Sequence, residues 1–298
     1  MRNIAATSGG LADLLEQPRF EVLPTSGTAD LVAAHVPGGR MLTVTASPSK
    51  GLEVTLALSV ELAGLGYEVV PHLAARMVAD EHHLAEVVDR LTEAGITRIF
   101  VPSGDAPEAG AYADAVSLLE ALTALGRPFP VVGITAYPES HPTISDDITI
   151  QAMWEKRRHA TEMVSNLSFD PRVVETWLGR VRRRGVTLPL WLGVPGRVDP
   201  TRLLSVATRI GVGDSTRFLL KHKRTVARLA SPRGFDTEKF LRTLAPALVS
   251  DASVVAGLHV FTFNQVAETE AWRARLVAKL REGGASPRST RRGPAATR

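Results

Sequence analysis

The sequence of 298 residues contains no cysteine. Disulfide bonds, thiolate nucleophiles and cysteine-ligated zinc or iron–sulfur sites are therefore excluded. Aromatic residues make up only 5% of the chain, and the part before residue 281 shows no basic stripe with interleaved aromatic residues. Such stripes are typical of proteins that bind single-stranded nucleic acid, so we expect no nucleic-acid partner.

Long apolar runs are also missing. No run approaches the length of a membrane span, and residues 1–15 lack the basic start and apolar stretch of a signal peptide. We therefore expect a cytoplasmic protein with no membrane partner.

Positive charge is in excess only at the C-terminal end. The chain has a formal net charge of +4 and a pI near 9.7. Residues 281–298 contain five arginines against one glutamate, so the rest of the chain is balanced. The Gly, Ala, Ser, Pro and Thr content of this segment predicts a disordered basic tail.

Eight short apolar runs recur along the chain, and the stretches between them have helical spacing. This alternation predicts βαβ units and a parallel sheet, and eight units suit a closed (β/α)8 TIM barrel. Gly95 marks the end of one helix, and Asp170 before a proline marks the start of another. We expect residues 1–18 to form a helical extension, residues 19–280 a single catalytic barrel domain with extra helices between the seventh and eighth strands, and residues 281–298 the tail. The runs are Arg19–Pro24, Met41–Thr45, Tyr67–Leu73, Thr97–Pro102, Phe129–Tyr137, Met163–Phe169, Leu188–Val194 and Gly257–Phe263.

Polar residues stand at or near the carboxyl ends of these runs, where a (β/α)8 barrel carries its active site. Glu21 lies among apolar neighbours, which would raise the pKa of its carboxyl group and suit it to general acid catalysis. Asp105 lies in a loop fixed by Gly104 and two prolines, and His72 follows the third run. Each also has a plainer interpretation: an ion-paired strand glutamate, a turn-capping aspartate and a hydrogen-bonded histidine.

The most distinctive loop reads AYPESHP and contains Tyr137, Glu139 and His141 between two prolines. The prolines restrict the backbone, while the three side chains offer an aromatic face, a carboxylate and an imidazole. A metal site could be built from His72, Asp105 and His141, but the chain has no H-E-x-x-H helix, and we expect no metal. No P-loop, G-x-S-x-G or G-x-G-x-x-G motif follows a strand, which argues against a Rossmann nucleotide site.

In their order along the chain, these motifs resemble those of the methylenetetrahydrofolate reductases, which are flavin-dependent (β/α)8 enzymes. The resemblance covers residues 20–264. The first run, with FE and a following proline, is similar to the family's F-E-F-x-P. The segments PHL, GDAP, AYPESHP and FTFN are similar to P-H-L, R-G-D-x-P, A-Y-P-E-x-H-P and F-Y-T-L-N.

This resemblance implies reduction of 5,10-methylenetetrahydrofolate to 5-methyltetrahydrofolate by NADH or NADPH. It implies that Glu21 protonates the leaving N10, and that Asp105 binds the pterin and stabilises the cationic intermediate. Asn166 and Phe169 would add contacts to the folate substrate. The residues implied for the cofactor pocket are Thr45, His72, Tyr137, Glu139 and His141.

Three departures from the family concern FAD. The family's Y-G-A after the second strand is replaced by ASPSKG, the arginine of R-G-D by Ser103, and the D-A-G-A turn by a shorter helical segment. We therefore expect direct hydride transfer without tightly bound FAD. The alternatives are an FAD-dependent reductase of the usual type, or a folate-binding barrel with another one-carbon reaction or no turnover. The oligomeric state does not follow from the sequence.

Overall fold

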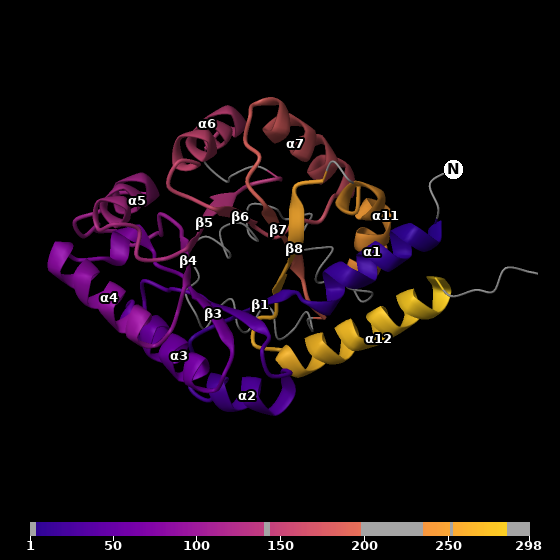
Figure 1. Cartoon of the computed structure of the whole chain (residues 1–298), viewed down its shortest axis with the longest axis horizontal. Helices are drawn as coiled ribbons and strands as arrows, with labels where there is room; N and C mark the ends of the chain where they lie inside the picture. Colours follow the sequence, from indigo (N-terminus) through magenta and orange to yellow (C-terminus); the bar gives the residue numbers. More distant parts are fainter. Residues whose placement is uncertain (1–3, 140–143, 198–234, 251–252, 285–298) are drawn as a thin grey trace, which may run out of the picture.

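The computed structural model describes residues 4–139, 144–197, 235–250 and 253–284 of the chain. In this part, eight parallel strands form one sheet in the order β3-β2-β1-β8-β7-β6-β5-β4. The edge strands β3 and β4 meet through a parallel bridge between His72 and Phe100, and Leu73 N–H donates to the Phe100 carbonyl at 2.8 Å. The strands form a ring with the helices outside it (Figure 1), so the predicted (β/α)8 barrel is confirmed.

Each predicted apolar run overlaps one strand of the barrel. The strands are β1 (Arg19–Val22), β2 (Met41–Val44), β3 (Glu68–Pro71), β4 (Arg98–Val101), β5 (Val131–Ala136), β6 (Glu162–Ser165), β7 (Leu190–Pro195) and β8 (Val255–Phe261). The helices are α1 (Ile4–Glu16), α2 (Thr28–His35), α3 (Glu53–Gly64), the 3-10 helix η1 (Ala75–Met77), α4 (Glu81–Glu93), α5 (Ala115–Ala124), α6 (Asp146–Lys156), α7 (Pro171–Arg183), α11 (Thr237–Leu248) and α12 (Val266–Gly284).

Local chemistry explains where several helices begin and end. The carboxylates of Asp80, Asp114, Asp170 and Asp236 each accept a backbone N–H bond at the start of α4, α5, α7 and α11. Such caps satisfy N–H groups that have no partner within the helix. Gly95 follows α4 with φ of 72°, a left-handed conformation that glycine adopts without strain.

Strand side chains alternate between the barrel interior and the side facing the helices. Phe20 and Val22 belong to the large core between the sheet and the helices. Val70, Phe100 and Val164 form a smaller apolar cluster that is separate from that core. Because successive strand residues point to opposite faces, Arg19 and Glu21 share the interior face of β1.

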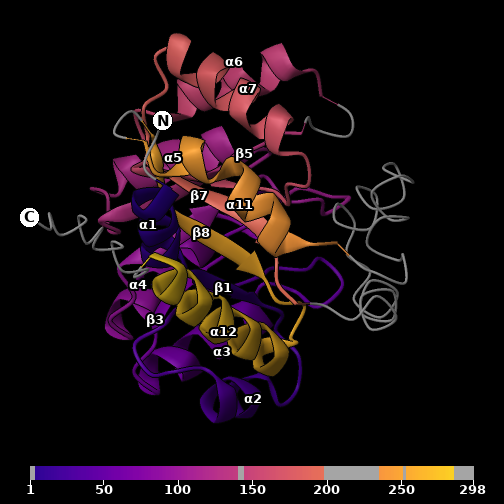
Figure 2. The ribbon, with the colours of Figure 1, turned by 90° about the vertical axis from the view of Figure 1, so that its right-hand side faces the viewer.

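The first and last described helices, α1 and α12, pack against each other (Figure 2). The last helix continues to Gly284, so the first residues of the segment 281–298 are helical and not tail. Arg281 in this helix forms ion pairs with Asp13 and Glu16 of α1, at 2.5 and 2.7 Å. Of the extra helices expected between β7 and β8, α11 is described, and the rest of that segment lies outside the described residues. None of the helices in the described ranges is both long and apolar enough to cross a membrane.

Candidate active site

A carboxylate and two histidines meet inside the barrel. The Oε2 atom of Glu21 in β1 lies 3.0 Å from the Nε2 atom of His259 in β8. The Nε2 atom of His72, the residue after β3, lies 3.8 Å from the same oxygen, which is too far for a hydrogen bond. The structure therefore brings two predicted residues together and adds His259 to them.

Burial sets the proton affinity of Glu21. It raises the pKa of this carboxyl group to about 7, while the nearby His72 acts in the opposite direction. The side chain nevertheless keeps 12% of its surface exposed. A carboxyl group with a pKa near neutrality and access to the barrel mouth can both give and take a proton at pH 7.

The two histidines are neutral at the same pH. Burial lowers the pKa of His72 to about 4 and that of His259 to about 3, and Arg19 lowers the second further. His259 Nε2 can donate to a Glu21 carboxylate or accept from a Glu21 carboxyl group, depending on its tautomer. The proton that titrates near neutrality therefore belongs to Glu21.

Aromatic rings hold both imidazoles in place. The ring of His72 makes an edge contact with Phe100, with centroids 4.7 Å apart, and His259 makes one with Phe261 at 4.8 Å. These contacts restrict the imidazoles without adding charge. The two side chains that face the Glu21 carboxylate are thus both neutral.

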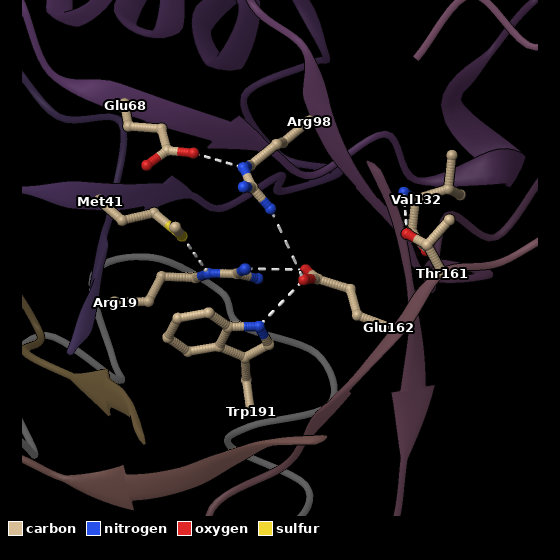
Figure 3. A network of polar contacts seen from close by, with 8 residues as sticks. All are labelled: Arg19, Met41, Glu68, Arg98, Val132, Thr161, Glu162 and Trp191. Carbon is tan, nitrogen blue, oxygen red and sulfur yellow. Dashed lines mark hydrogen bonds and ion pairs between the residues drawn. The ribbon is translucent and has the colours of Figure 1, made fainter. Parts of the chain in front are cut away.

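A second polar group, which we call the barrel-floor network, fills the interior toward the amino ends of the strands (Figure 3). Arg19 is fully buried and donates from Nη2 to Glu162 Oε1 at 2.7 Å. Trp191 donates its indole N–H to the other oxygen of Glu162 at 2.9 Å. Arg98 lies 3.9 Å from Glu162 and forms an ion pair with Glu68, so the network contains two cations and two anions.

Asp105 lies in the partly exposed loop that follows β4. Gly104 adopts a φ of 80° in this loop. Arg76 holds the loop because its guanidinium donates to the carbonyls of Ala106 at 2.7 Å and Pro107 at 2.9 Å. The loop that carries Asp105 is therefore tied to η1, and the role of the Asp105 carboxylate in substrate binding stays a prediction.

The two residues expected to contact substrate after β6 differ in exposure. Asn166 is partly exposed directly after the strand. Its backbone approaches β7 so closely that a Cβ on Gly193 would lie 2.5 Å from the Asn166 carbonyl oxygen, which explains the glycine. Phe169 is buried, and its ring packs against Phe235 at 5.2 Å. Their binding roles stay predictions.

Glu139, expected in a cofactor pocket, connects two loops of the barrel. Its Oε1 accepts the backbone N–H groups of Phe169 and Asp170, the latter at 2.6 Å. A carboxylate at this position also interacts favourably with the amino end of α7. Tyr137 is partly exposed beside it, and His141 lies outside the described residues.

The remaining cofactor-pocket residues, Thr45 and His72, lie at the ends of β2 and β3. The carbonyl of Thr45 accepts the Thr55 hydroxyl at 2.9 Å, which ties β2 to α3. His72 belongs to the Glu21 cluster. In the described ranges, no group of three or more His, Asp or Glu side chains is arranged to hold a metal ion.

Sequence reasoning missed His259, Arg19 and Glu162. Each is a charged or titratable residue of a mainly apolar strand, and a similar signal pointed to Glu21. The pattern marks a polar side chain inside the barrel. It does not reveal which of these side chains touch, because β1, β6 and β8 are far apart in the sequence.

No family model matches the chain. Among solved structures, the chain is similar to a protein from Burkholderia cenocepacia J2315 provisionally named a lyase/mutase, with 18% identity and a TM-score of 0.43 over 85% of this chain and 98% of the other. It is also similar to a provisionally named phosphonomutase from the same organism, with 10% identity and a TM-score of 0.47 over 94% of this chain and 100% of the other. Identities this low relate the chains by fold alone, so neither name is transferred.

The predicted membership of the methylenetetrahydrofolate reductases is contradicted, since no family model, of that family or of any other, matches the chain. Folate reduction and the NAD(P)H-dependent oxidoreductase class are corrected with it. The physical reason why the motif resemblance misled is that polar residues at strand ends also make hydrogen bonds that stabilise the fold. Glu139 accepts the backbone N–H of Asp170 just before α7. Asn264 ties β8 to β1, because its Oδ1 accepts Leu23 N–H at 2.8 Å and its Nδ2 donates to the Leu23 carbonyl at 3.0 Å.

Proposed function

We propose that this chain is an enzyme of general acid–base chemistry, in which Glu21 moves a proton to or from a substrate at the carboxyl ends of the strands. One observation carries the proposal: the Glu21 carboxyl group is largely buried, has a pKa near 7, and is paired only with neutral histidines among the described residues. A structural carboxylate would be expected to pair with a cation, as Glu162 does with Arg19.

The hydrogen bond between His259 and Glu21 leaves one Glu21 oxygen for the substrate. His259 Nε2 contacts Oε2, and Oε1 has no hydrogen bond to any described residue. A protonated Glu21 can donate to a departing group or to a carbon atom, and the carboxylate can remove a proton. Well-placed proton transfer contributes roughly 10²–10⁴ to the rate.

Reactions that depend on such a proton transfer include eliminations, additions and isomerisations, which belong to the lyase and isomerase classes. His72 would contribute a neutral imidazole, since its Nε2 is buried without a hydrogen bond to a described residue. Asp105 and Asn166 at the rim are proposed to bind polar groups of a small-molecule substrate. NADH, NADPH and FAD enter no step of this proposal.

The proposal is tested without knowing the substrate. Purified wild-type protein and the Glu21→Gln variant are each incubated with a small-molecule cell extract in ²H₂O, and the mixtures are compared by mass spectrometry. Glutamine keeps the shape of the side chain but cannot exchange the proton. We expect compounds that gain one deuterium, or that appear or disappear, with the wild-type protein only.

A Glu53→Gln variant on the exposed surface of α3 serves as the matched control and should behave like the wild-type protein. If Glu21→Gln changes the extract as fast as the wild-type protein does, or if neither protein changes any compound, the proposed function is wrong.

A further inference from the structure

Arg19 lies directly beside the Glu21–His259 pair inside the barrel. Arg19 and His259 are register partners on β1 and β8, so their side chains are neighbours on the interior face. Glu21 follows two residues later on the same face of β1. A fixed positive charge therefore stands next to the imidazole that holds the Glu21 carboxyl group.

The packing keeps this cation in place. Figure 3 shows the Arg19 guanidinium between Met41 and Glu162 and next to Trp191. Its carbon Cζ lies 4.2 Å from the centre of the Trp191 ring. The ring itself rests on the backbone of β8, because a Cβ on Gly257 would lie 2.4 Å from it. The guanidinium has little freedom to leave His259.

A glutamate and a histidine in contact can share one proton in two ways. The pair is either a carboxyl group with a neutral imidazole, or a carboxylate with an imidazolium. With ordinary pKa values the second arrangement prevails, because histidine is the stronger base by about two units. A neighbouring cation disfavours the imidazolium and so favours the first.

We propose that Arg19 is a positioning residue that keeps the shared proton on Glu21 and off His259. In the disfavoured state the proton would move from Glu21 Oε2 to His259 Nε2, with no other bond changed. The inference deepens the proposed function, since Glu21 can act as an acid near neutrality only while it holds this proton.

The other charges around His259 do not cancel this effect. Arg19 lowers the pKa of His259 and also that of His72, whereas Glu162 raises that of His259 by a smaller amount. The titratable groups that face the imidazole are Arg19 and Glu21 from β1, His72 after β3 and Glu162 from β6. Glu68 and Arg98 complete the barrel-floor network farther away and pair with each other.

The test is the charge state of His259, read from the ¹⁵N NMR signals of its imidazole between pH 4 and 8. The signals are assigned with a His259→Gln variant. The spectra compare the wild-type protein with Arg19→Gln, which removes the cation, and Arg19→Lys, which keeps it. Arg98→Gln is the matched control, because it removes the other cation that lies near Glu162.

We expect a neutral His259 across this range in the wild-type protein. Arg19→Gln should raise its titration midpoint by about one to three pH units, whereas Arg19→Lys, which keeps a cation, should show little of that shift. Arg98→Gln should leave His259 neutral across the range, as in the wild-type protein, because this cation is farther from His259. Glu162 retains Arg98 and the Trp191 N–H in the Arg19→Gln variant, which favours folding.

If Arg19→Gln does not fold, the double variant Arg19→Gln/Glu162→Gln replaces the ion pair by an amide pair and should shift the midpoint in the same direction. An unchanged His259 in these variants, or an equal shift in Arg98→Gln, would overturn the inference. The spectra do not depend on turnover. An active Glu21→Gln variant together with a shifted His259 would therefore disprove the proposed function alone.

Discussion

Two carboxylates inside the same barrel have opposite surroundings. Glu162 in the barrel-floor network lies 2.7 Å from a guanidinium and also accepts an indole N–H. Glu21, nearer the carboxyl ends of the strands, contacts two imidazoles that are neutral at pH 7. Their side chains are similarly buried, at 6% and 12% exposed.

The comparison indicates that the charge of the contacting groups, more than the exposed fraction of the side chain, decides whether a buried carboxylate stays ionised or keeps an exchangeable proton. A buried ion pair is fixed in its charge and holds the structure in one arrangement. A buried carboxylate without a cation keeps a proton that can be exchanged near neutrality. The barrel thus places a structural charge cluster and the carboxyl group that we propose to be catalytic only two strand residues apart, at Arg19 and Glu21.

The largest expected effect on stability comes from breaking the Arg19–Glu162 ion pair of the barrel-floor network. Glu162→Gln leaves Arg19 buried without a counter-charge, and we expect the free energy of unfolding to fall by about 3–5 kcal/mol. Urea unfolding at pH 7 measures the change. Glu53→Gln breaks the exposed pair with Arg90 and should cost less than about 1 kcal/mol. Equal losses in the free energy of unfolding for the two variants would show that the buried Arg19–Glu162 pair stabilises the fold no more than an exposed pair does.

The second expected effect is a gain in stability, in contrast to the loss expected for Glu162→Gln, and it concerns Glu21. The pKa of this carboxyl group is raised from its ordinary value of 4.5 to about 7 in the folded protein, so folding favours its protonated form. The stability that this gives is fully present below pH 4.5 and is lost as the pH rises through 7. Glu21→Gln removes this dependence, and above pH 8 the variant should be more stable than the wild-type protein by up to about 3 kcal/mol.

The measurement is the difference in urea stability between the two proteins from pH 4 to 8. His72 and His259 act in the reverse direction, because their lowered pKa values cost stability as the pH falls below 6.5. That contribution is present in both proteins and largely cancels in the difference. A difference that does not grow between pH 4.5 and 7 would show that Glu21 has an ordinary pKa.

The fold could be predicted from the sequence because its signals are local. Each strand is a short apolar run, and Asp170 before a proline or Gly95 after an apolar stripe marks a helix end by its own backbone chemistry. Eight alternations of strand and helix then leave few arrangements other than a closed barrel. The strand boundaries differ from the ends of the apolar runs by no more than four residues.

The site could be predicted only in part because its contacts are not local. Glu21 and His72 were found from their places at strand ends. The pairing of Glu21 with His259 joins residues 238 positions apart and depends on the register between β1 and β8. Glu139 shows the converse, since a polar residue in a distinctive loop was assigned to a pocket while its Oε1 accepts backbone N–H groups across two loops.

Glu139 also supplies the smallest expected effect, and it sharpens the comparison at the carboxyl ends of the strands. Its carboxylate accepts the N–H groups of Phe169 and Asp170, whereas the Glu21 carboxylate accepts no backbone N–H group of the described residues. Glu139→Gln keeps the shape but replaces a charged acceptor by a neutral one, so we expect a loss of about 1–2 kcal/mol in urea unfolding. Asp170→Ala, which removes the cap that accepts Arg172 N–H, should cost a similar amount and provides the control. Unchanged stability together with lost turnover in Glu139→Gln would instead return this residue to the predicted binding pocket and make it a partner of Glu21 in the chemistry.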